Sequence, residues 1–453
     1  MKMKFYAVTV ICALILLLVS GCGSGQGAAS SPPSSGTGSP SASSPQSSQT
    51  PPSSGEHSPE ETMPAASEPA PEVTSPPPED TSEDARIKMT MQAMTLEEKV
   101  GQMLLAGVQG TKVDAAAKQM IAKDHVGGII LFKNNLSGGF RSSAELLNGL
   151  KAANLGNPVP LFLSVDQEGG RVSRLPKEFE PMPAAAIVGK TGDAALAEQM
   201  GGLIAQQLQL LGFNVDFAPV LDTFSNPKNT VIGDRSFGSK PELVAEMGTA
   251  EMKGIRDGGI LPVVKHFPGH GDTSVDSHKD LPIVRKSEAD LLKLELRPFQ
   301  YAISQGVEAV MVAHILFPEL DPDMPASLSE PIITDLLRDK LGFDDVVITD
   351  DLAMGAIAKN YGAPEAAIRA VEAGGDILLM AHSYDVAHQI YEALLKSVRD
   401  GRIPESRIDE SVARILKLKF AYGMTDDEVP IPAASDIPND AIRQWREQVN
   451  NRG

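Results

Sequence analysis

The sequence predicts an α/β fold, a (β/α)8 TIM-type barrel that forms a single catalytic domain. Seven short apolar runs, rich in β-branched residues, each end in a polar or charged residue and alternate with amphipathic helical segments. Such runs, without polar alternation, are typical of parallel strands buried on both faces. With an earlier candidate strand near Leu104–Val108, they give about eight βα units, the number that closes this barrel. The runs are Gly127–Asn134, Pro160–Gln167, Asn214–Asp222, Leu261–His266, Glu308–His314, Asp345–Asp351 and Asp376–His382.

Boundary signals place several helices around these runs. A capping box begins a helix at Thr95, and the amphipathic segment Ala194–Leu211 ends at a glycine. Another helix is expected over Ala289–Ser304, with a kink caused by Pro298. The last helix of the barrel is expected over Ile408–Phe420. A doubly wound open sheet is the alternative fold, and it is disfavoured because no phosphate-binding glycine fingerprint follows a strand.

Residues 1–22 have the features of a lipoprotein signal peptide. Two lysines precede the apolar run Val8–Val19, which is too short for a dedicated membrane-spanning helix. The run ends in Val19-Ser20-Gly21-Cys22, which resembles a bacterial lipoprotein cleavage box. The resemblance implies that Cys22 is lipid-modified and anchors the protein to the outer face of the cell membrane. An ordinary secretory signal with an incidental cysteine is the alternative.

Composition divides the remaining chain into a linker, a barrel and a tail. Residues 23–85 contain 17 Ser, 13 Pro, nine acidic residues and no Lys or Arg, so we expect them to be disordered. The barrel domain is expected over residues 86–425. Residues 426–453 are expected to form a C-terminal tail with a helix-like end around Ala441–Val449.

Charge and cysteine content exclude two classes of protein. The 453 residues carry a net charge of −19, and nine of the negative charges lie in the linker. An acidic domain argues against a nucleic-acid partner, because phosphate binding needs a dense basic face. The two cysteines, Cys12 and Cys22, both precede the barrel, so a disulfide scaffold is excluded.

The ends of the predicted strands nominate an active site. In a barrel, polar residues at the C-terminal ends of the strands face one site. The densest polar segment, Lys265–His278, begins at such an end and holds three of the eight histidines and two aspartates. The strand ends supply Asp166, Asp222, Lys265, His266, His314, Asp350 and Asp351.

Two chemistries fit the polar segment. An acid/base site would use Asp276 and His278, because in an extended chain residues i and i+2 point the same way and the carboxylate can fix the imidazole tautomer. Asp350 or Asp351 could then be a nucleophile, although Asp351 could instead cap the following helix. A site for zinc or a similar ion would take as ligands His266, His270, Asp272, Asp276 and His278.

Five motifs, in this order, give the chain a specific resemblance. Over roughly residues 90–425 the chain resembles the family 3 glycoside hydrolases, most closely the NagZ-type β-N-acetylglucosaminidases. That resemblance implies a (β/α)8-like barrel. The motifs are VDQEGG at Val165–Gly170, DFAPVLD at Asp216–Asp222, GDRSFG at Gly233–Gly238, KHFPGHGDT at Lys265–Thr273 with DSH at Asp276–His278, and TDDLAM at Thr349–Met354.

The resemblance also implies a role for individual residues. Asp350 corresponds to the catalytic nucleophile, His278 to the acid/base, and Asp276 to the partner of that histidine. The family uses no metal and no other cofactor. The residues implied to hold the hydroxyl groups of the terminal sugar are Asp166, Arg235, Lys265 and His266.

The implied function is retaining, exo-acting hydrolysis of terminal β-linked N-acetylglucosamine from peptidoglycan fragments, through a glycosyl-enzyme on Asp350. The expected partners are this carbohydrate and, through the lipid anchor only, the membrane; the protein is expected to be a monomer. A β-glucosidase-like specificity is an alternative. So is a phosphorylase, because a neutral histidine tolerates an anionic phosphate better than a carboxylate does. A lipid-anchored wall- or solute-binding protein is the non-enzyme alternative.

Overall fold

The computed structural model describes residues 82–273 and 275–453. The predicted signal peptide, the predicted lipidation site Cys22 and nearly all of the predicted linker lie outside the described residues. Within the described part, no helix is both long enough and apolar enough to cross a membrane.

The first helix, α1 (Glu83–Ala93), corrects the boundary between linker and barrel. Its first three residues, which composition assigned to the linker, form a helical turn. Ser82 caps this turn by accepting a hydrogen bond from the N–H of Ala85, and acidic side chains in a first turn favour a helix by opposing its dipole. Local capping therefore outweighs the low hydrophobicity of the segment.

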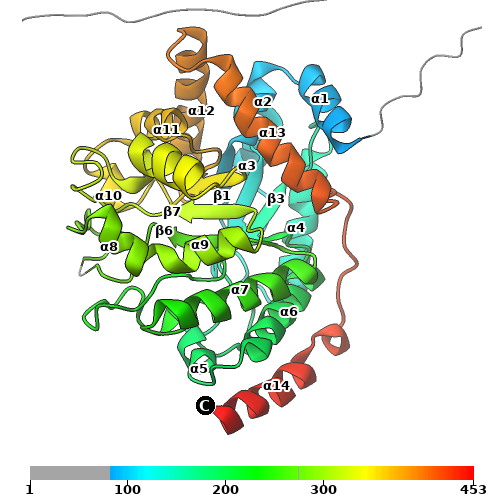
Figure 1. Cartoon of the computed structure of the whole chain (residues 1–453). Helices are drawn as coiled ribbons and strands as arrows, with labels where there is room; N and C mark the ends of the chain where they lie inside the picture. The colour runs from blue at the N-terminus through cyan, green and yellow to red at the C-terminus, as the bar shows by residue number, and fades with distance from the viewer. Residues whose placement is uncertain (1–81, 274) are drawn as a thin grey trace, which may run out of the picture. The chain divides into compact units, whose positions relative to one another are not determined.

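The predicted barrel is confirmed as a ring of parallel strands (Figure 1). Neighbouring strands pair in the orders β5-β4-β3-β2-β1-β9 and β6-β7-β8. β5 and β6 are two halves of one strand interrupted at Val263, and the bridges Val220–Lys265 and Ile348–Ile377 join the two sheets into one ring. The strands are β1 (Leu104–Gly107), β2 (Gly128–Leu131), β3 (Phe162–Val165), β4 (Val215–Asp216), β5 (Leu261–Pro262), β6 (Val264–Phe267), β7 (Ala309–Val312), β8 (Val346–Thr349) and β9 (Leu378–Met380).

Helices surround this ring and bury the outer faces of the strands. Every residue of every strand is buried, as the unbroken apolar runs predict. The remaining α-helices are α2 (Leu96–Gln102), α3 (Ala115–Lys123), α4 (Phe140–Asn154), α5 (Ala185–Gly189), α6 (Ala194–Leu211), α7 (Pro241–Asp257), α8 (Glu288–Lys293), α9 (Leu296–Ser304), α10 (Gly355–Ala358), α11 (Ala363–Glu372), α12 (Tyr384–Arg399), α13 (Glu405–Ala421) and α14 (Asn439–Arg452). Short 3-10 helices cover Gly233–Arg235, Ala326–Leu328 and Ala434–Asp436, and a π-helix covers Pro331–Lys340.

The capping predictions are confirmed, whereas one predicted helix is wrong as a single element. Thr95 closes a capping box on α2, and α6 ends in a left-handed glycine. The segment expected to be one kinked helix forms α8 and α9, and the chain leaves helical geometry at Leu294. A proline ring clashes with the carbonyl four residues before it. The break therefore lies one turn before Pro298 rather than at it.

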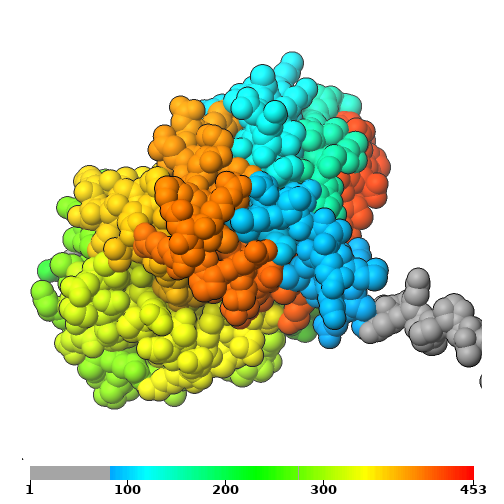
Figure 2. Space-filling view, turned by 90° about the horizontal axis from the view of Figure 1, so that it is seen from above, coloured from blue at the N-terminus to red at the C-terminus, as the bar shows by residue number. Residues whose placement is uncertain are grey.

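The N-terminal end of the barrel is covered by α1, α2 and α13 (Figure 2). The guanidinium of Arg86 lies 3.7 Å from the centre of the Phe420 ring of α13. A groove beside α1 is also lined by Asp344 and Asp345, which precede β8. The described chain thus enters the barrel at the end where its strands begin.

The C-terminal tail packs along the outside of the barrel and ends in α14 (Figure 1). The side chain of Asn148 on α4 exchanges two hydrogen bonds with the backbone of Val429. In α14, Ile442, Trp445 and Val449 are buried, and the indole N–H of Trp445 donates to the carbonyl of Leu196 on α6. The described barrel and tail form one compact unit.

Candidate active site

A cavity of about 200 Å³ lies at the C-terminal ends of the barrel strands. Its walls come from the strand ends and from the loops that follow them, as expected for a (β/α)8 barrel. Six of the seven predicted sugar-binding and catalytic residues line it: Asp166, Arg235, Lys265, His266, His278 and Asp350. Asp276, the seventh, contacts the cavity-lining His278.

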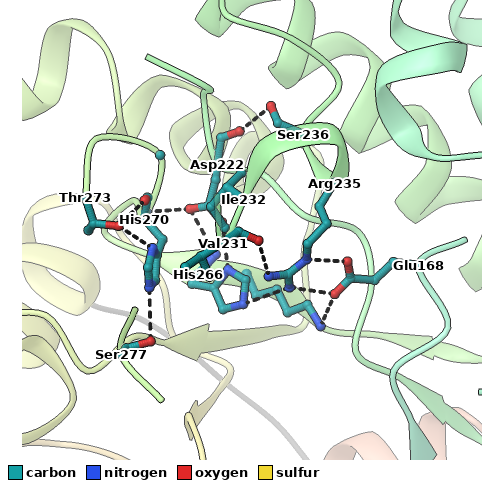
Figure 3. A network of polar contacts seen from close by, with 12 residues as sticks. Glu168, Asp222, Val231, Ile232, Arg235, Ser236, His266, His270, Thr273 and Ser277 are labelled. Carbon is teal, nitrogen blue, oxygen red and sulfur yellow. Dashed lines mark hydrogen bonds and ion pairs between the residues drawn. The ribbon is translucent and has the colours of Figure 1, made fainter. Parts of the chain in front are cut away.

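A buried network of two cations and two carboxylates forms one wall of the cavity. The ammonium nitrogen of Lys265 lies 2.6 Å from Asp166 Oδ1 and 2.7 Å from Glu168 Oε1. Arg235 donates to both carboxylate oxygens of Glu168, from Nε at 2.7 Å and from Nη2 at 2.8 Å. Figure 3 shows the Glu168 carboxylate facing the Arg235 guanidinium, with dashed lines between them. Glu168 therefore fixes both cations in place.

These pairings keep the network ionised despite burial. Burial by itself would raise the pKa of Glu168, but Arg235 and Lys265 outweigh it and hold that pKa well below its usual range. Burial would likewise lower the pKa of Lys265, but Asp166 and Glu168 outweigh it and raise that pKa above its usual value. The cavity wall thus presents fixed charges that can hold hydroxyl groups without protonation changes.

Asp222 anchors the start of the polar segment beneath the cavity (Figure 3). Its Oδ2 lies 2.7 Å from Nδ1 of His266, and its Oδ1 accepts the backbone N–H of His270 at 2.6 Å. Burial would raise the pKa of Asp222, but the His266 imidazole outweighs it and lowers that pKa. The nominated Asp222 therefore orients His266 toward the cavity and does not itself line it.

Asp350 and Asp351 follow β8 and differ in their contacts. Oδ1 of Asp350 accepts the N–H of Asp351 at 2.8 Å, and the carboxyl lines the cavity. Oδ1 of Asp351 accepts the N–H groups of Ala353 and Ala381. Asp351 also lines the cavity, but its carboxyl is committed to joining the ends of β8 and β9. It does not cap α10, whose N-cap residue is Met354.

The pKa values of the two carboxyl groups move in opposite directions. Burial raises the pKa of Asp351, and the two backbone donors offset this only in part. Burial would also raise the pKa of Asp350, but the imidazoles of His314 and His266 and the N–H of Asp351 outweigh it, so that this pKa is lowered. Asp350 is therefore the better candidate for an ionised nucleophile.

His278 and Asp276 are in contact, as the sequence predicts, but through a turn. Nδ1 of His278 lies 3.0 Å from Asp276 Oδ1, which also accepts the backbone N–H of His278 at 3.0 Å. The N–H of Lys279 returns to the carbonyl of Asp276, so the aspartate opens a turn and the segment is not extended. The contact leaves Nε2 of His278 free to face the cavity, the position a proton donor would need.

His314, the remaining nominated strand end, is fully buried behind the cavity. Its Nε2 contacts the carbonyl of Asp351 at 3.0 Å and its Nδ1 contacts Oγ of Ser327 at 2.6 Å. Burial lowers the pKa of His314. The side chain therefore supports the segment that carries Asp350 and does not reach the cavity.

Comparison with known protein families shows which family the chain belongs to. The model of the glycosyl hydrolase family 3 N-terminal domain matches residues 95–418. The chain belongs to glycosyl hydrolase family 3. The predicted membership of the glycoside hydrolases and the predicted fold class are both confirmed.

Several family 3 relatives are similar over most of their length. A β-hexosaminidase, LpqI, of Mycobacterium tuberculosis is 38% identical over 331 residues, covering 71% of this chain and 82% of the relative. A β-hexosaminidase of Nitrosomonas eutropha is 34% identical over 325 residues, covering 70% of this chain and 91% of the relative. The structure of a family 3 β-N-acetylglucosaminidase from Paenibacillus sp. superposes with a TM-score of 0.76 at 44% identity, covering 80% of this chain and 69% of that one.

Two charged residues of the cavity were missed by sequence reasoning. Glu168 lies in the quoted VDQEGG motif, but only Asp166 of that motif was nominated, because Asp166 ends the apolar run. Arg174 lines the cavity, with Nη2 3.8 Å from Asp166 Oδ2 and a buried Nε that has no hydrogen-bond partner in the described part of the chain. The cluster of charged residues from Asp166 to Arg174 is the sequence feature that could have indicated both.

The zinc alternative is not supported by the geometry. Three of the five residues it would use contact groups outside the set: His266 contacts Asp222, His270 contacts two hydroxyl groups, and Asp272 pairs with Lys286. The other two, Asp276 and His278, contact each other. Among residues 82–273 and 275–453, no group of three or more His, Cys, Asp or Glu side chains is arranged to hold a metal ion.

Proposed function

We propose that this family 3 enzyme is a retaining, exo-acting β-N-acetylglucosaminidase. The observation that carries the proposal is one small cavity that combines a half-buried carboxylate, Asp350, with a histidine–aspartate pair and a wall of fixed charges. The relatives named β-hexosaminidase and β-N-acetylglucosaminidase support this choice of sugar. A cavity of about 200 Å³ is smaller than typical drug-sized pockets, which favours a single terminal sugar over a polymer.

The proposed reaction has two steps: His278 gives up a proton in the first and takes one up in the second. Asp350 attacks the anomeric carbon and forms a glycosyl-enzyme ester, while His278 donates a proton to the leaving oxygen. His278 then removes a proton from the water that hydrolyses the ester. Asp276, hydrogen-bonded to Nδ1, holds the imidazole in one tautomer and stabilises its protonated form. An imidazole can donate a proton in one step and accept one in the other, which suits both steps better than a permanently ionised group.

The fixed charges of the wall bind the terminal sugar in this proposal. Asp166 and His266 can exchange hydrogen bonds with sugar hydroxyl groups, and Lys265 and Arg235 can donate them. All four side chains are held by other protein groups, so little rotamer freedom is lost when the sugar binds. This arrangement would place the anomeric carbon next to Asp350.

Replacement of the nucleophile tests the proposal directly. Asp350→Ala should lower the hydrolysis of an aryl β-N-acetylglucosaminide by several orders of magnitude, because no ester can form. Asp335→Ala, which changes an exposed aspartate of the π-helix, is the control and should keep full activity. Trapping with a 5-fluoro sugar followed by peptide mapping should label Asp350. Label on another residue, or Asp350→Ala activity equal to wild type, would refute the assignment.

The same assay separates hydrolysis from phosphorolysis and tests sugar preference. Rates for aryl N-acetylglucosaminides, glucosides and xylosides should differ strongly in favour of the first. Added phosphate should neither accelerate the reaction nor give a sugar 1-phosphate. Formation of that product would replace the hydrolase proposal with a phosphorylase.

We further propose that the enzyme is anchored through a lipid on Cys22 and acts on peptidoglycan fragments outside the cytoplasmic membrane. Support comes from the sequence at residues 1–22, since two acyl chains make membrane attachment stable. Cells that express the protein should incorporate radioactive palmitate into it, and Cys22→Ala should abolish the label while Cys12→Ala keeps it. Equal labelling of wild type and Cys22→Ala would exclude the anchor.

A further inference from the structure

The loop between β6 and α8 carries His278 and is fixed at two points that lie outside the proposed catalytic residues. The first point is the side chain of His270, near the start of the loop. The second is the start of α10, which follows Asp350. Ser277, the residue between Asp276 and His278, contacts both of them.

His270 lines the cavity and lies between the proposed sugar-holding His266 and Ser277 (Figure 3). The side chain is buried, and the backbone N–H of the residue donates to Asp222. Nδ1 lies 2.9 Å from Oγ1 of Thr273, and Nε2 lies 3.1 Å from Oγ of Ser277. Burial lowers the pKa of His270 to about 4, so the imidazole is neutral at physiological pH.

The hydrogen bonds around the neutral ring define its tautomer. Oγ1 of Thr273 can donate to the carbonyl of His270 at 3.1 Å, so it is available to accept the proton of Nδ1. Nε2 is then the acceptor, and the hydroxyl of Ser277 donates to it. The hydroxyl proton of Ser277 is therefore engaged in the hydrogen bond to Nε2 of His270. This bond favours the side-chain rotamer of Ser277 that points toward His270.

The backbone of the same turn is fixed from the other side. The carbonyl of Ser277 accepts the N–H of Ala356, and the carbonyl of His278 accepts the N–H of Gly355. A Cβ atom at Gly355 would lie 2.8 Å from the carbonyl oxygen of His278, closer than real contacts allow. The turn that carries His278 is therefore hydrogen-bonded to, and in close contact with, the segment that follows Asp350.

We propose that His270 and Ser277 are positioning residues that set the place of His278 relative to Asp350. The proposal rests on the proposed function, in which His278 is the acid. His270 and Ser277, which share a hydrogen bond, both have buried side chains, whereas the side chain of His278 is exposed at the cavity mouth. The exposed acid/base thus obtains a fixed position from a buried neighbour, as a loop-borne catalytic group requires.

Ser277→Ala tests this proposal, because it removes one hydroxyl and leaves the turn otherwise intact. For an N-acetylglucosaminide with a poor leaving group, such as phenyl, kcat/KM should fall about tenfold, the effect of losing one buried hydrogen bond. For a 2,4-dinitrophenyl leaving group, which needs no proton, the loss should be under about threefold. Trapping by a 5-fluoro glycosyl fluoride should proceed at the wild-type rate, because Asp350 is unchanged.

Two variants complete the experiment. Ser287→Ala removes a serine hydroxyl that caps α8 at the end of the same loop, and should leave the ratio of the two leaving groups unchanged. His278→Ala should show the same leaving-group pattern as Ser277→Ala, with a larger loss. If Ser277→Ala lowers kcat/KM equally on both substrates, or on neither, the positioning role is wrong. Activity of the wild-type protein would still uphold the proposed function in that case. A wild-type protein inactive on every substrate would overturn both.

Discussion

At the scale of single residues, two adjacent aspartates have different surroundings and therefore different roles. Asp351 accepts two backbone N–H groups and ties β8 to β9, whereas Asp350 accepts one and faces the cavity. The same logic separates the two carboxylates of the cavity wall. Both line the cavity, but Glu168 pairs with Arg235 and Lys265 and its side chain is only 5% exposed, whereas the Asp166 side chain is 17% exposed. Glu168 is therefore a fixed support, and Asp166 is the candidate for contact with the sugar.

Replacement of Glu168 tests this support role. Glu168→Gln should lower the free energy of unfolding at pH 7 by about 3–5 kcal/mol, because it leaves two buried cations incompletely paired. The folded-state pKa of Glu168 is lowered, so its stabilising effect is full above the ordinary pKa of 4.5 and is lost as pH falls below it. Urea unfolding of wild type and variant should thus converge toward acidic pH. A difference that stays constant from pH 7 to acidic pH would contradict this account.

At the scale of elements, α7 and β4 bring two further carboxyl groups into the interior. Glu251 of α7 and Asp216 of β4 are buried, and each has one oxygen without a hydrogen-bond partner among the described residues. Burial, as the main cause, raises both pKa values well above their ordinary range, and the nearby Asp216 carboxyl raises the pKa of Glu251 further. Ionisation of either group inside the fold is therefore unfavourable.

Glu251→Gln should remove one source of pH sensitivity. Because the folded-state pKa is raised, the folded protein keeps a proton that the unfolded chain releases above the ordinary pKa of 4.5. The stabilisation is full below that value and falls as pH rises toward the folded-state pKa. Glu251→Gln should match wild type in acid and unfold at higher urea concentration at pH 8. Glu246→Gln, an exposed position of α7, is the control, and a Glu251→Gln curve parallel to wild type would contradict the prediction.

At the scale of the whole molecule, the tail is an integral part of the folded unit. Beyond the family-matched residues 95–418, the chain runs along α4 and fastens α14 to α6. Asn439 of α14 also accepts the N–H of Glu180 and donates to the carbonyl of Glu178. These two residues lie in the segment that follows Arg174. The tail thus steadies a loop that contributes to the cavity.

The single tryptophan, Trp445, allows tail docking to be measured separately. Tryptophan fluorescence and far-UV circular dichroism should report coincident unfolding transitions, because tail and barrel form one unit. Ile442→Ala should lower the free energy of unfolding by about 2–5 kcal/mol through loss of buried contacts. Gln448→Ala, exposed on the same helix, should have no measurable effect. A fluorescence transition that precedes the dichroism transition would show that the tail docks independently.

The sequence predicts the barrel well because strands buried on both faces leave an unambiguous apolar signal. It also predicts the cavity residues at strand ends, such as Asp166 and Asp350, because barrel topology sends those ends to one face. Glu168 and Arg174 escape this reasoning, since they lie in a loop whose path depends on tertiary contacts. The break before Pro298 and the turn at Asp276 likewise depend on local backbone geometry that spacing alone does not reveal. The proposed roles of Asp350, His278 and Asp276 remain predictions.

The entry point of the chain has a consequence for how the enzyme can be presented to substrates. The described chain begins beside the residues that precede β8, at one end of the barrel, and the cavity lies at the opposite end. A support attached through the N-terminal side therefore leaves the cavity mouth unobstructed. Immobilisation on beads through a residue before Ser82 should keep kcat/KM for a small aryl glycoside near its value in solution. Coupling through an exposed residue at the cavity rim, such as Lys279, should reduce it.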